Sequence, residues 1–308
     1  MEVSIEILFL TTQQEDYLAD SVMYGLRMRL GKDLIDVPKK DVMYKDGLTP
    51  KNEIYGFGFT LWKLLPDIEM DREKIFERIA ANEFDVIIFS DIFRQQNQFA
   101  HCTVFDWFSK TTAKWVFLDG SDDGFPTVYD ATHRGIYFKR DNPFNYPQII
   151  NIGLSIPESK ILREKPAKTR LFTTYVQCEE AYRLQWIKDN CTNKRVFETE
   201  ESYYHDLSLS KYGITMKKSG WDTPRHMENA SQWVVNCIYQ LDSKPKDVQP
   251  FWNDGENCIG WNSAEELAKK VKKIEDTPGE YERLQQGSVA WMKTRTCEVI
   301  ADYMLSKI

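Results

Sequence analysis

Short apolar runs rich in β-branched and aromatic residues alternate with amphipathic stretches along this chain, and this alternation limits the possible folds more than any other feature. Val86–Phe89 and Lys114–Leu118 are typical of buried strands, whereas Asp16–Leu30 repeats its apolar residues at helical spacing. Strands that alternate with helices form parallel sheets covered by helices. The sequence therefore predicts an α/β fold.

The first half of the chain contains most of the strand-like runs. The patterns predict strands at Ile5–Leu10, Ile35–Val37, Val86–Phe89, Lys114–Leu118 and Gly135–Phe138, and helices at Asp16–Leu30 and Arg72–Asn82. Between them, Tyr44–Pro66 is rich in Gly and aromatic residues and has little periodicity. We interpret this segment as an excursion of the first domain.

A turn-rich segment at Asp141–Pro147, followed by a Lys/Arg/Pro run up to Arg170, predicts a domain boundary. The alternation then restarts, with strands expected at Leu171–Tyr175, Lys194–Phe197, Tyr212–Met216 and Cys258–Trp261. Helices are expected at Glu179–Asn190, Tyr203–Ser210 and Arg225–Val235, then after a capping box formed by Ser263 and Glu266, and over the last part of the chain with an interruption near Gly287.

The length of 308 residues fits two domains at about 150 residues each. We expect Rossmann-like domains at 1–155 and 156–285 with a cleft between them, and helices at 286–308 that pack back toward the first domain. Hydrophobic residues make up 42% of the chain, which is enough for ordinary cores. The net charge of −7 gives the whole molecule no attraction for nucleic acid or anionic membranes.

The start of the chain lacks the basic leader and cleavage site of a signal peptide, and no apolar run has the length of a membrane span. The six cysteines are scattered, without a CxxC pair, which is typical of buried thiols in a reducing compartment. We therefore expect no membrane span and a cytoplasmic location, in a bacterium or a phage-infected host.

The segment Lys217–Glu228 is the strongest candidate for a binding site. It follows a predicted strand, and Pro224 stands where a helix would begin. The free N–H groups of a helix start attract an anion, and Lys218 and Arg225 would add formal charge for a diphosphate. Glu228 would accept both hydroxyls of a ribose. The alternative is an Arg–Glu pair on a solvated helix, which composition alone favours.

Asp119–Gly124 follows a predicted first-domain strand and carries three carboxylates. Asp119 or Asp122 would serve as general base on an acceptor hydroxyl, or the loop would hold the acceptor by hydrogen bonds. A calcium loop is excluded because a strand precedes the segment and Pro126 lies in its second half. The structural alternative is an Asp/Gly turn at the end of a strand.

Lys139 and Arg140 end the next predicted strand, where they would reach phosphates across the cleft or remain solvated charges. His226 and His133 are candidates for ligand contacts, although each is more often an ordinary structural histidine. The chain has no GxGxxG, Walker or Gly-x-Ser-x-Gly motif, so dehydrogenase, P-loop and hydrolase functions lack their signatures. No carboxylate pair is suitably placed for a metal-held diphosphate, so we expect no metal.

Tyr212–Glu228, with its strand, Gly-Trp-Asp turn and Arg-x-x-Glu helix start, resembles the spore-maturation CgeB-like glycosyltransferases of the GT-B fold. Four further segments of the chain resemble landmarks of this family, in the family's order. They are Leu118–Asp123, Tyr137–Arg140, Ser155–Pro157 and Asp254–Ile259. The resemblance implies a GT-B-like α/β fold and a ribose role for Glu228. One departure is Trp233, which stands where the family has a small residue and would close part of a nucleotide pocket or stack on a base.

The resemblance implies a hexosyl- or pentosyltransferase that needs no cofactor beyond its nucleotide-sugar donor, a UDP-sugar first. The lack of a suitably placed carboxylate pair predicts that it is metal-independent. The residues expected to bind the donor are Lys218, Trp221, Asp222, Arg225, His226, Glu228, Lys139 and Arg140, and those expected at the acceptor are Asp123, Tyr55 and Phe57. The acceptor would be a glycan, a protein, a metabolite or a hydroxymethylated base of phage DNA. The alternative function is a catalytically degenerate module that binds a nucleotide or glycan.

Overall fold

The computed structural model describes the chain except for residues 1–4, 91, 93, 95–108 and 145. It divides into two compact units, one made of Met1–Pro157 with Cys297–Ile308 and one made of Glu158–Thr296. The sequence analysis predicted boundaries at residues 155 and 285. The second boundary differs from the predicted one because helix α9 (Glu280–Lys293) belongs to the second unit, and only the segment from Cys297 joins the first.

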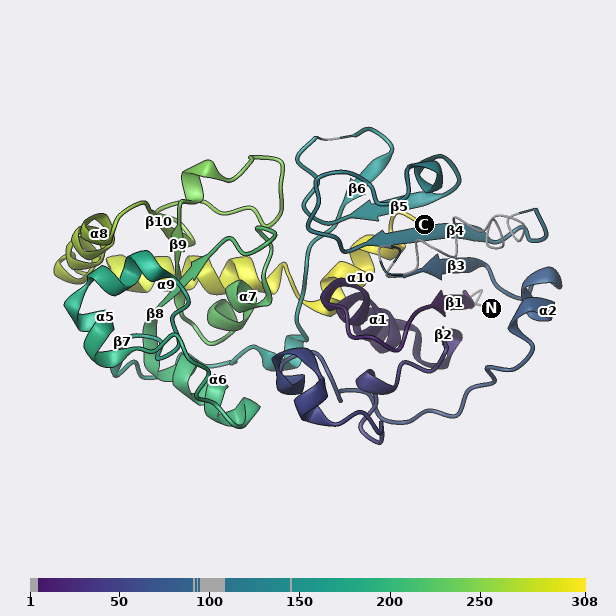
Figure 1. Cartoon of the computed structure of the whole chain (residues 1–308), viewed down its shortest axis with the longest axis horizontal. Coiled ribbons are helices and arrows are strands. Elements are labelled where there is room, and N and C mark those ends of the chain that lie inside the picture. The colour runs from purple at the N-terminus through teal and green to yellow at the C-terminus, as the bar shows by residue number, and fades with distance from the viewer. Residues whose placement is uncertain (1–4, 91, 93, 95–108, 145) are drawn as a thin grey trace. The chain divides into compact units, whose positions relative to one another are not determined.

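The first unit contains a parallel sheet of six strands in the order β2-β1-β3-β4-β5-β6 (Figure 1). Its strands are β1 (Ile7–Leu10), β2 (Leu34–Val37), β3 (Val86–Phe89), β4 (Lys114–Asp119), β5 (Ile136–Lys139) and β6 (Ile149–Asn151). The strands are almost wholly buried, since helices in such a fold cover both faces of the sheet. The strands predicted in this half are confirmed, and β6 was missed because it has only three residues.

Helix α1 (Tyr17–Leu30) begins at Asp16, whose side chain accepts a hydrogen bond from the backbone N–H of Ala19. The other α-helices given for this unit are α2 (Ile75–Ala80), shorter than the predicted Arg72–Asn82, and α10 (Cys297–Leu305). Gly25 lets α1 and α10 touch, because a Cβ there would lie 2.0 Å from the carbonyl oxygen of Cys297. The segment from Cys297 is thus part of the core packing of the first unit.

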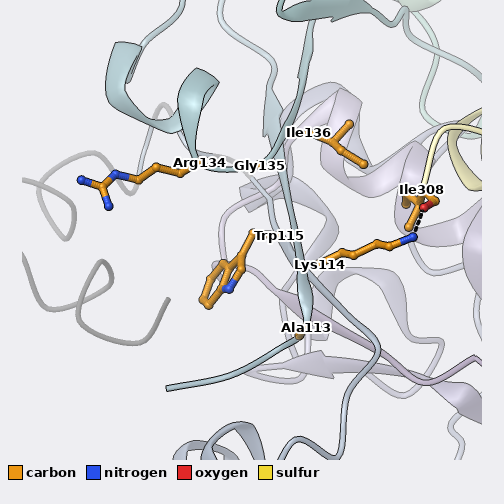
Figure 2. Close-up of a pocket in the computed structure, with 7 residues that line it drawn as sticks. All are labelled: Ala113, Lys114, Trp115, Arg134, Gly135, Ile136 and Ile308. Atoms are coloured by element: carbon orange, nitrogen blue, oxygen red, sulfur yellow. Dashed lines mark hydrogen bonds between the residues drawn. The ribbon is translucent and has the colours of Figure 1, made fainter. Parts of the chain in front are cut away.

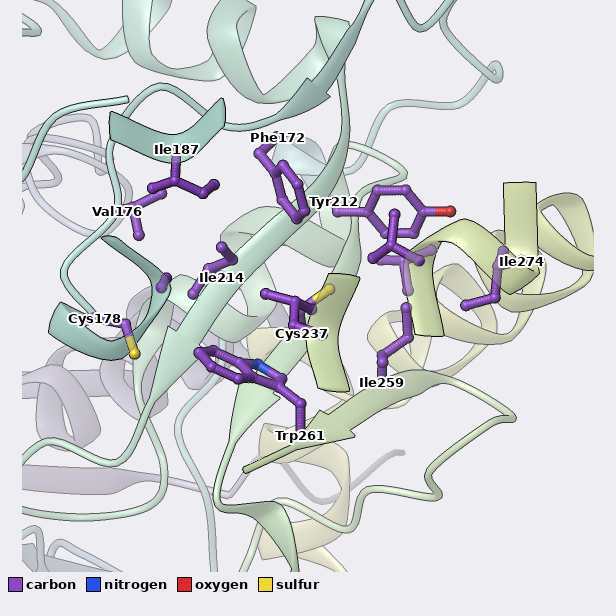
Figure 3. Packing of buried hydrophobic residues seen from close by; sticks show 14 of the residues in the cluster. Phe172, Val176, Cys178, Ile187, Tyr212, Ile214, Cys237, Ile259, Trp261 and Ile274 are labelled. Atoms are coloured by element: carbon purple, nitrogen blue, oxygen red, sulfur yellow. The ribbon is translucent and has the colours of Figure 1, made fainter. Parts of the chain in front are cut away.

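The second unit contains a parallel sheet in the order β10-β9-β8-β7 (Figure 1). Its strands are β7 (Arg170–Phe172), β8 (Ser210–Met216), β9 (Val235–Tyr239) and β10 (Cys258–Trp261), and its helices besides α9 are α5 (Gln185–Asn190), α6 (Glu200–Leu209), α7 (Pro224–Ser231) and α8 (Ala264–Asp276). Figure 3 shows one face of this sheet, where Ile214, Cys237 and Ile259 from three adjacent strands pack in one cluster with helical Ile187 and Ile274.

Four sequence predictions in this unit need correction. The strand expected at Lys194–Phe197 is absent, and only Thr192 forms a bridge there, to Tyr175. The helix expected at Glu179–Asn190 breaks at Leu184 into a 3-10 turn and α5. Helix α9 continues through Gly287, where the lack of a side chain lets the helix lie against the backbone of Glu256.

The fourth correction concerns α7, which ends at Ser231 instead of reaching Val235. Trp233 has a φ of 61°, a left-handed conformation that reverses the chain into β9. The apolar run that looked like the end of a helix is therefore a buried strand, a known ambiguity of short apolar runs. Ser263 caps α8 as predicted, although Glu266 accepts its hydrogen bond from the N–H of Asn262 rather than from that of Ser263.

Candidate functional site

The loop from β8 to α7 is held in place by a close approach between the two elements. Gly213 of β8 lies directly under Asn229 of α7, and a Cβ at residue 213 would be 2.3 Å from the amide nitrogen of Asn229. That amide donates to Asn236 of β9, which in turn donates to the carbonyl of His226. Buried amide pairs of this kind fix a helix against its sheet. The position of α7 is thus set by β8 and β9.

The start of α7 lacks a side-chain cap. Thr223 occupies the N-cap position but its side chain makes no capping hydrogen bond in the described structure, and Pro224 follows at the first helical position. N-terminal N–H groups that no side chain caps need another partner, and an anion fits them best. This end of α7 lies beyond the carboxyl end of β8, where ligands of α/β proteins usually bind.

Two cations lie beside the start of α7. Partial burial lowers the pKa of Lys218, and the charge of Arg225 lowers it further. The guanidinium of Arg225 stacks over the ring of Tyr175 at 4.4 Å, and the ammonium of Lys218 is 3.4 Å from the carbonyl of Gln177. Like charges held close together are unfavourable unless an anion joins them. The two positive charges are thus close enough to affect one another.

Glu228 lies one turn further along α7 and is only 9% exposed. One of its carboxylate oxygens accepts a hydrogen bond of 2.6 Å from the hydroxyl of Tyr203 in α6. Burial and the neighbouring charge of Glu228 raise the pKa of Tyr203 well above its usual value, so the tyrosine remains a donor. A carboxylate has acceptor positions for several donors, so this bond fixes the side chain while leaving it able to accept others.

The remaining residues of the Gly-Trp-Asp turn are buried. Trp221 is 8% exposed and lies under the ammonium of Lys217, and Asp222 is 2% exposed. His226 is 1% exposed, and burial, together with the charges of Arg225 and Lys244, lowers its pKa to about 3. The imidazole is therefore neutral at physiological pH. Tyr175 and Tyr203, which carry no local motif, support the site and were missed in the sequence.

The sequence suggested that Trp233 follows Glu228 on the same helix, and the structure shows that it does not. It lies past the carboxyl end of α7, whose eight residues span roughly 12 Å at 1.5 Å per residue. Its indole N–H donates to the carbonyl of Leu162 at 2.9 Å. The side chain thus serves to join two loops of the second unit, at the opposite end of α7 from the cations.

Asp119, at the end of β4, is completely buried. Its carboxylate accepts hydrogen bonds from the backbone N–H groups of Ser121 and Thr127 and from the hydroxyl of Tyr137. Lys139 is also completely buried, with its ammonium 3.6 Å from this carboxylate and hydrogen-bonded to Ser121. Burial lowers the pKa of Lys139. Asp119 and Lys139 thus hold the loop in place from within, and neither side chain is exposed to a ligand.

Asp122 and Arg140 form an ion pair in which the Asp122 side chain is 39% exposed. Asp123 beside it is exposed as well. The loop after β4 therefore presents two carboxylates on its surface while the third, Asp119, anchors it. Both basic residues at the end of β5 are buried, and only Arg140 pairs with an exposed carboxylate of the loop.

Tyr55 and Phe57 are exposed in the loop after β2, at 67% and 39%. Tyr55 packs edge-on against Tyr17 at the start of α1, with ring centroids 5.8 Å apart. The loop after β4 approaches the same helix start, since a Cβ on Gly120 would lie 3.3 Å from the Asp16 carboxylate. The two predicted acceptor segments thus both approach one helix N-terminus, and no direct contact between them is found among the described residues.

A cavity of about 620 Å³ lies at the opposite edge of this sheet, at the first residues of β4 and β5 (Figure 2). Its lining includes Trp115 and Arg134, and Lys114 donates a hydrogen bond of 2.5 Å to the carbonyl of Ile308. None of the site residues predicted from the sequence lines it. Among the described residues, no helix has the length and apolar character needed to cross a membrane, and no three acidic, His or Cys side chains are grouped as metal ligands.

Comparisons with known proteins bear on the fold. No family model and no curated protein matches the sequence. Among solved structures, a glycosyltransferase from Rickettsia africae matches with a TM-score of 0.61 at 11% identity, over 99% of this chain and 97% of that chain. HepE of Anabaena, in complex with UDP and glucose, matches with a TM-score of 0.56 at 8% identity, over 98% and 99%. An alpha-glucosyltransferase in complex with UDP matches with a TM-score of 0.53 at 9% identity, over 99% of each chain.

At these identities the likeness concerns the fold alone. It extends over nearly the full length of each chain, so the order of elements agrees from end to end. The prediction of an α/β chain with two Rossmann-like parallel sheets, as in GT-B glycosyltransferases, is confirmed. The subfamily, the donor and the site residues remain predictions. This chain thus has the GT-B-like fold of the glycosyltransferases.

Proposed function

We propose that the chain is a glycosyltransferase that moves a sugar from a nucleoside-diphosphate sugar to a hydroxyl acceptor. The observation that carries the proposal is the uncapped start of α7 with Lys218 and Arg225 beside it. This arrangement would bind a diphosphate through backbone N–H groups and two cations together. Glu228, one turn on, would accept the ribose hydroxyls.

The same groups would stabilise the transition state. When the bond between the sugar and the diphosphate breaks, negative charge grows on the departing phosphate oxygen. Lys218, Arg225 and the positive end of the α7 dipole are already in position to meet that charge, which lowers the barrier without reorganisation during the reaction. Cationic side chains would then do what a metal ion does in other transferases, and we keep metal independence as part of the proposal.

The acceptor would bind to the first unit. The exposed Asp122 and Asp123 are suited to accept the proton of an acceptor hydroxyl, whereas Asp119 supports their loop from within. Tyr55 and Phe57 would contribute apolar surface. We retain Asp122 as the proposed base and assign Asp119 and Lys139 a positioning role, because their polar atoms are engaged inside the loop.

UDP-sugars are the first donors to consider, because two of the structures with this fold are complexes with UDP. We keep the CgeB-like subfamily as the proposed relationship, on the motif around Arg225 and Glu228. A reducing cytoplasm is the proposed compartment, since the five cysteines in the described part of the chain are free thiols. The transferred sugar, hexose or pentose, and the acceptor are for experiment to identify.

A panel of nucleotides tests the proposal directly. Bound ligand stabilises a protein by mass action, so UDP, GDP, CDP and their sugars are added separately and the melting temperature is measured. One nucleotide should raise the melting temperature far more than the others, and its sugar should be hydrolysed slowly when no acceptor is present. A panel without any stabilising nucleotide would contradict the proposal.

A binding module that has lost catalysis is the competing function. In the sequence, the best support for such a module was Trp233. In the structure, the indole N–H of Trp233 donates a hydrogen bond to the carbonyl of Leu162, past the end of α7. The two functions differ in turnover. Binding of a nucleotide sugar with no hydrolysis and no transfer to any sugar, peptide or nucleic-acid acceptor would favour the module.

A further inference from the structure

Buried polar atoms of His226, Trp252 and Arg295, near the start of α7, have no hydrogen-bond partner in the described structure. Both ring nitrogens of His226, the indole N–H of Trp252, and Nε and one terminal nitrogen of Arg295 are in this state. His226 is 1% exposed and Arg295 is 8% exposed. Buried polar atoms are almost always hydrogen-bonded, so a group of unsatisfied ones indicates a missing ligand.

These side chains are neighbours although they are far apart in the sequence. The ring of His226 meets the ring of Trp252 edge-on at 5.3 Å, and Trp252 stacks on Trp291 at 3.9 Å. Trp291 lies in the last turn of α9, and Arg295 follows it four residues later, just past the end of that helix. Helix α9 packs against α7. The end of α9 thus brings Arg295 toward the start of α7.

The charge of Arg295 is also felt at the turn before α7. Burial lowers the pKa of this guanidinium, and the carboxylate of Asp222 raises it in part. Within the described residues Arg295 forms no salt bridge with a carboxylate, and a buried cation with no counter-charge in direct contact is costly for a fold to retain. A fold that keeps such a cation next to a binding loop gains from it only when an anion is bound.

We propose that Arg295, together with His226 and Trp252, binds an oxygen of the donor's diphosphate and so completes the anion site at α7. The proposal rests on the proposed transferase function, because the donor supplies that diphosphate. The chemistry of the cluster selects the ligand. The guanidinium and the indole only donate hydrogen bonds, and the neutral imidazole has one donor, so the ligand must be rich in acceptor oxygens and negatively charged. Water would satisfy single atoms but would bring no negative charge to the guanidinium.

The test measures binding of inorganic pyrophosphate and of UDP by calorimetry, and the melting temperature without ligand, for the full chain. Arg295→Met removes the charge and keeps the length of the side chain. Arg283→Met is the matched control, because Arg283 lies on α9, the helix that Arg295 follows, and is half exposed and paired with Glu280. Trp252→Phe removes a single N–H from a partly exposed ring and provides a second variant that should fold.

Arg295→Met should weaken the binding of both ligands by about tenfold to a hundredfold, the range of a charge-assisted hydrogen bond. Trp252→Phe should weaken it by about threefold to tenfold, and Arg283→Met should leave it unchanged. The ligand-free melting temperature of Arg295→Met should stay constant or rise, because an unpaired buried charge is removed. A purely structural arginine would instead give a lower melting temperature and unchanged affinity, which would overturn the proposal.

The two probes separate this proposal from the function on which it rests. If pyrophosphate binds in an Arg295-dependent way while no nucleotide binds more tightly than pyrophosphate, the anion site stands and the transferase function fails. If UDP binds equally well to Arg295→Met, Trp252→Phe and the unaltered protein, the function stands and the role of Arg295 is refuted. Absence of binding of both probes to the unaltered protein would overturn both.

Discussion

At the scale of single residues, environment decides which of the predicted side chains can meet a ligand. The sequence shows three carboxylates in Asp119–Gly124 and cannot rank them, because burial depends on contacts made far along the chain. Asp119 receives hydrogen bonds from Thr127 and Tyr137, and these leave it no exposed surface. Arg295, 67 residues beyond Glu228 in number, carries no motif at all. Residue types were thus predictable, but their accessibility was not.

The loop after β4 gives the first prediction. Asp119→Asn should lower the free energy of unfolding by about 3 kcal/mol, because Lys139 would lose the negative charge 3.6 Å away inside the protein. Asp122→Asn should change it by less than about 1 kcal/mol, since its ion pair is partly exposed, but should reduce sugar transfer. Urea unfolding and a transfer assay measure the two effects. Equal losses of stability in both variants would contradict the assignment.

His226 gives a prediction on pH. Its pKa of about 3 in the folded protein lies below the usual 6.5, so the unfolded chain takes up the proton first as the pH falls. Stability is therefore lost progressively from pH 6.5 downward, toward pH 3. When the pH falls from 7 to 5, the titration of His226 should lower the free energy of unfolding by about 2 kcal/mol.

The matched variant for this effect is His226→Gln, which has no titrating group in that range. Its unfolding free energy, measured by urea denaturation without ligand at pH 7 and pH 5, should fall by about 2 kcal/mol less than that of the unaltered protein. Equal falls in the two proteins would show that the histidine is not held neutral in the folded state.

At the scale of elements, the start of α7 was predictable and its end was not. Pro224 and the preceding strand are local signals, and both β8 and the helix start are where the sequence placed them. The end depends on Trp233, whose left-handed backbone has no signal in its residue type, and on β9, whose apolar run suits a strand or a helix equally. The strand predicted at Lys194–Phe197 is absent, because a short run of strand-forming residues also suits an irregular loop.

The contact between β8 and α7 predicts a link between packing and binding. Gly213→Ala should push Asn229 aside and lower the unfolding free energy by about 1–3 kcal/mol. Nucleotide affinity should fall with it, because the displaced helix carries Arg225 and Glu228. Gly260→Ala in β10 is the control, since its nearest neighbour is the more adaptable Leu241 side chain at 3.2 Å. Affinity that survives in Gly213→Ala would contradict the link.

At the scale of the whole molecule, the sequence pattern breaks near residue 155, and the structure divides into two units after Pro157. The sequence analysis placed the returning helices at 286–308, and the segment that belongs to the first unit begins at Cys297. The contact between Gly25 and Cys297 that ties α10 to α1 joins residues far apart in the sequence, and no local pattern encodes it. The comparison over the whole chain adds that its fold matches those of solved glycosyltransferases over nearly the full length.

The central claim is that α7 holds the donor nucleotide with Glu228 on its ribose. The most direct measurement is the affinity of the best-binding nucleoside diphosphate and of its 2′-deoxy analogue for the unaltered protein and for Glu228→Gln. The unaltered protein should prefer the ribose form by about tenfold, since a charged acceptor bond is lost in the analogue. Glu228→Gln should bind both forms with nearly equal, weaker affinity. Equal affinities in the unaltered protein, or a preference that persists in the variant, would contradict the claim.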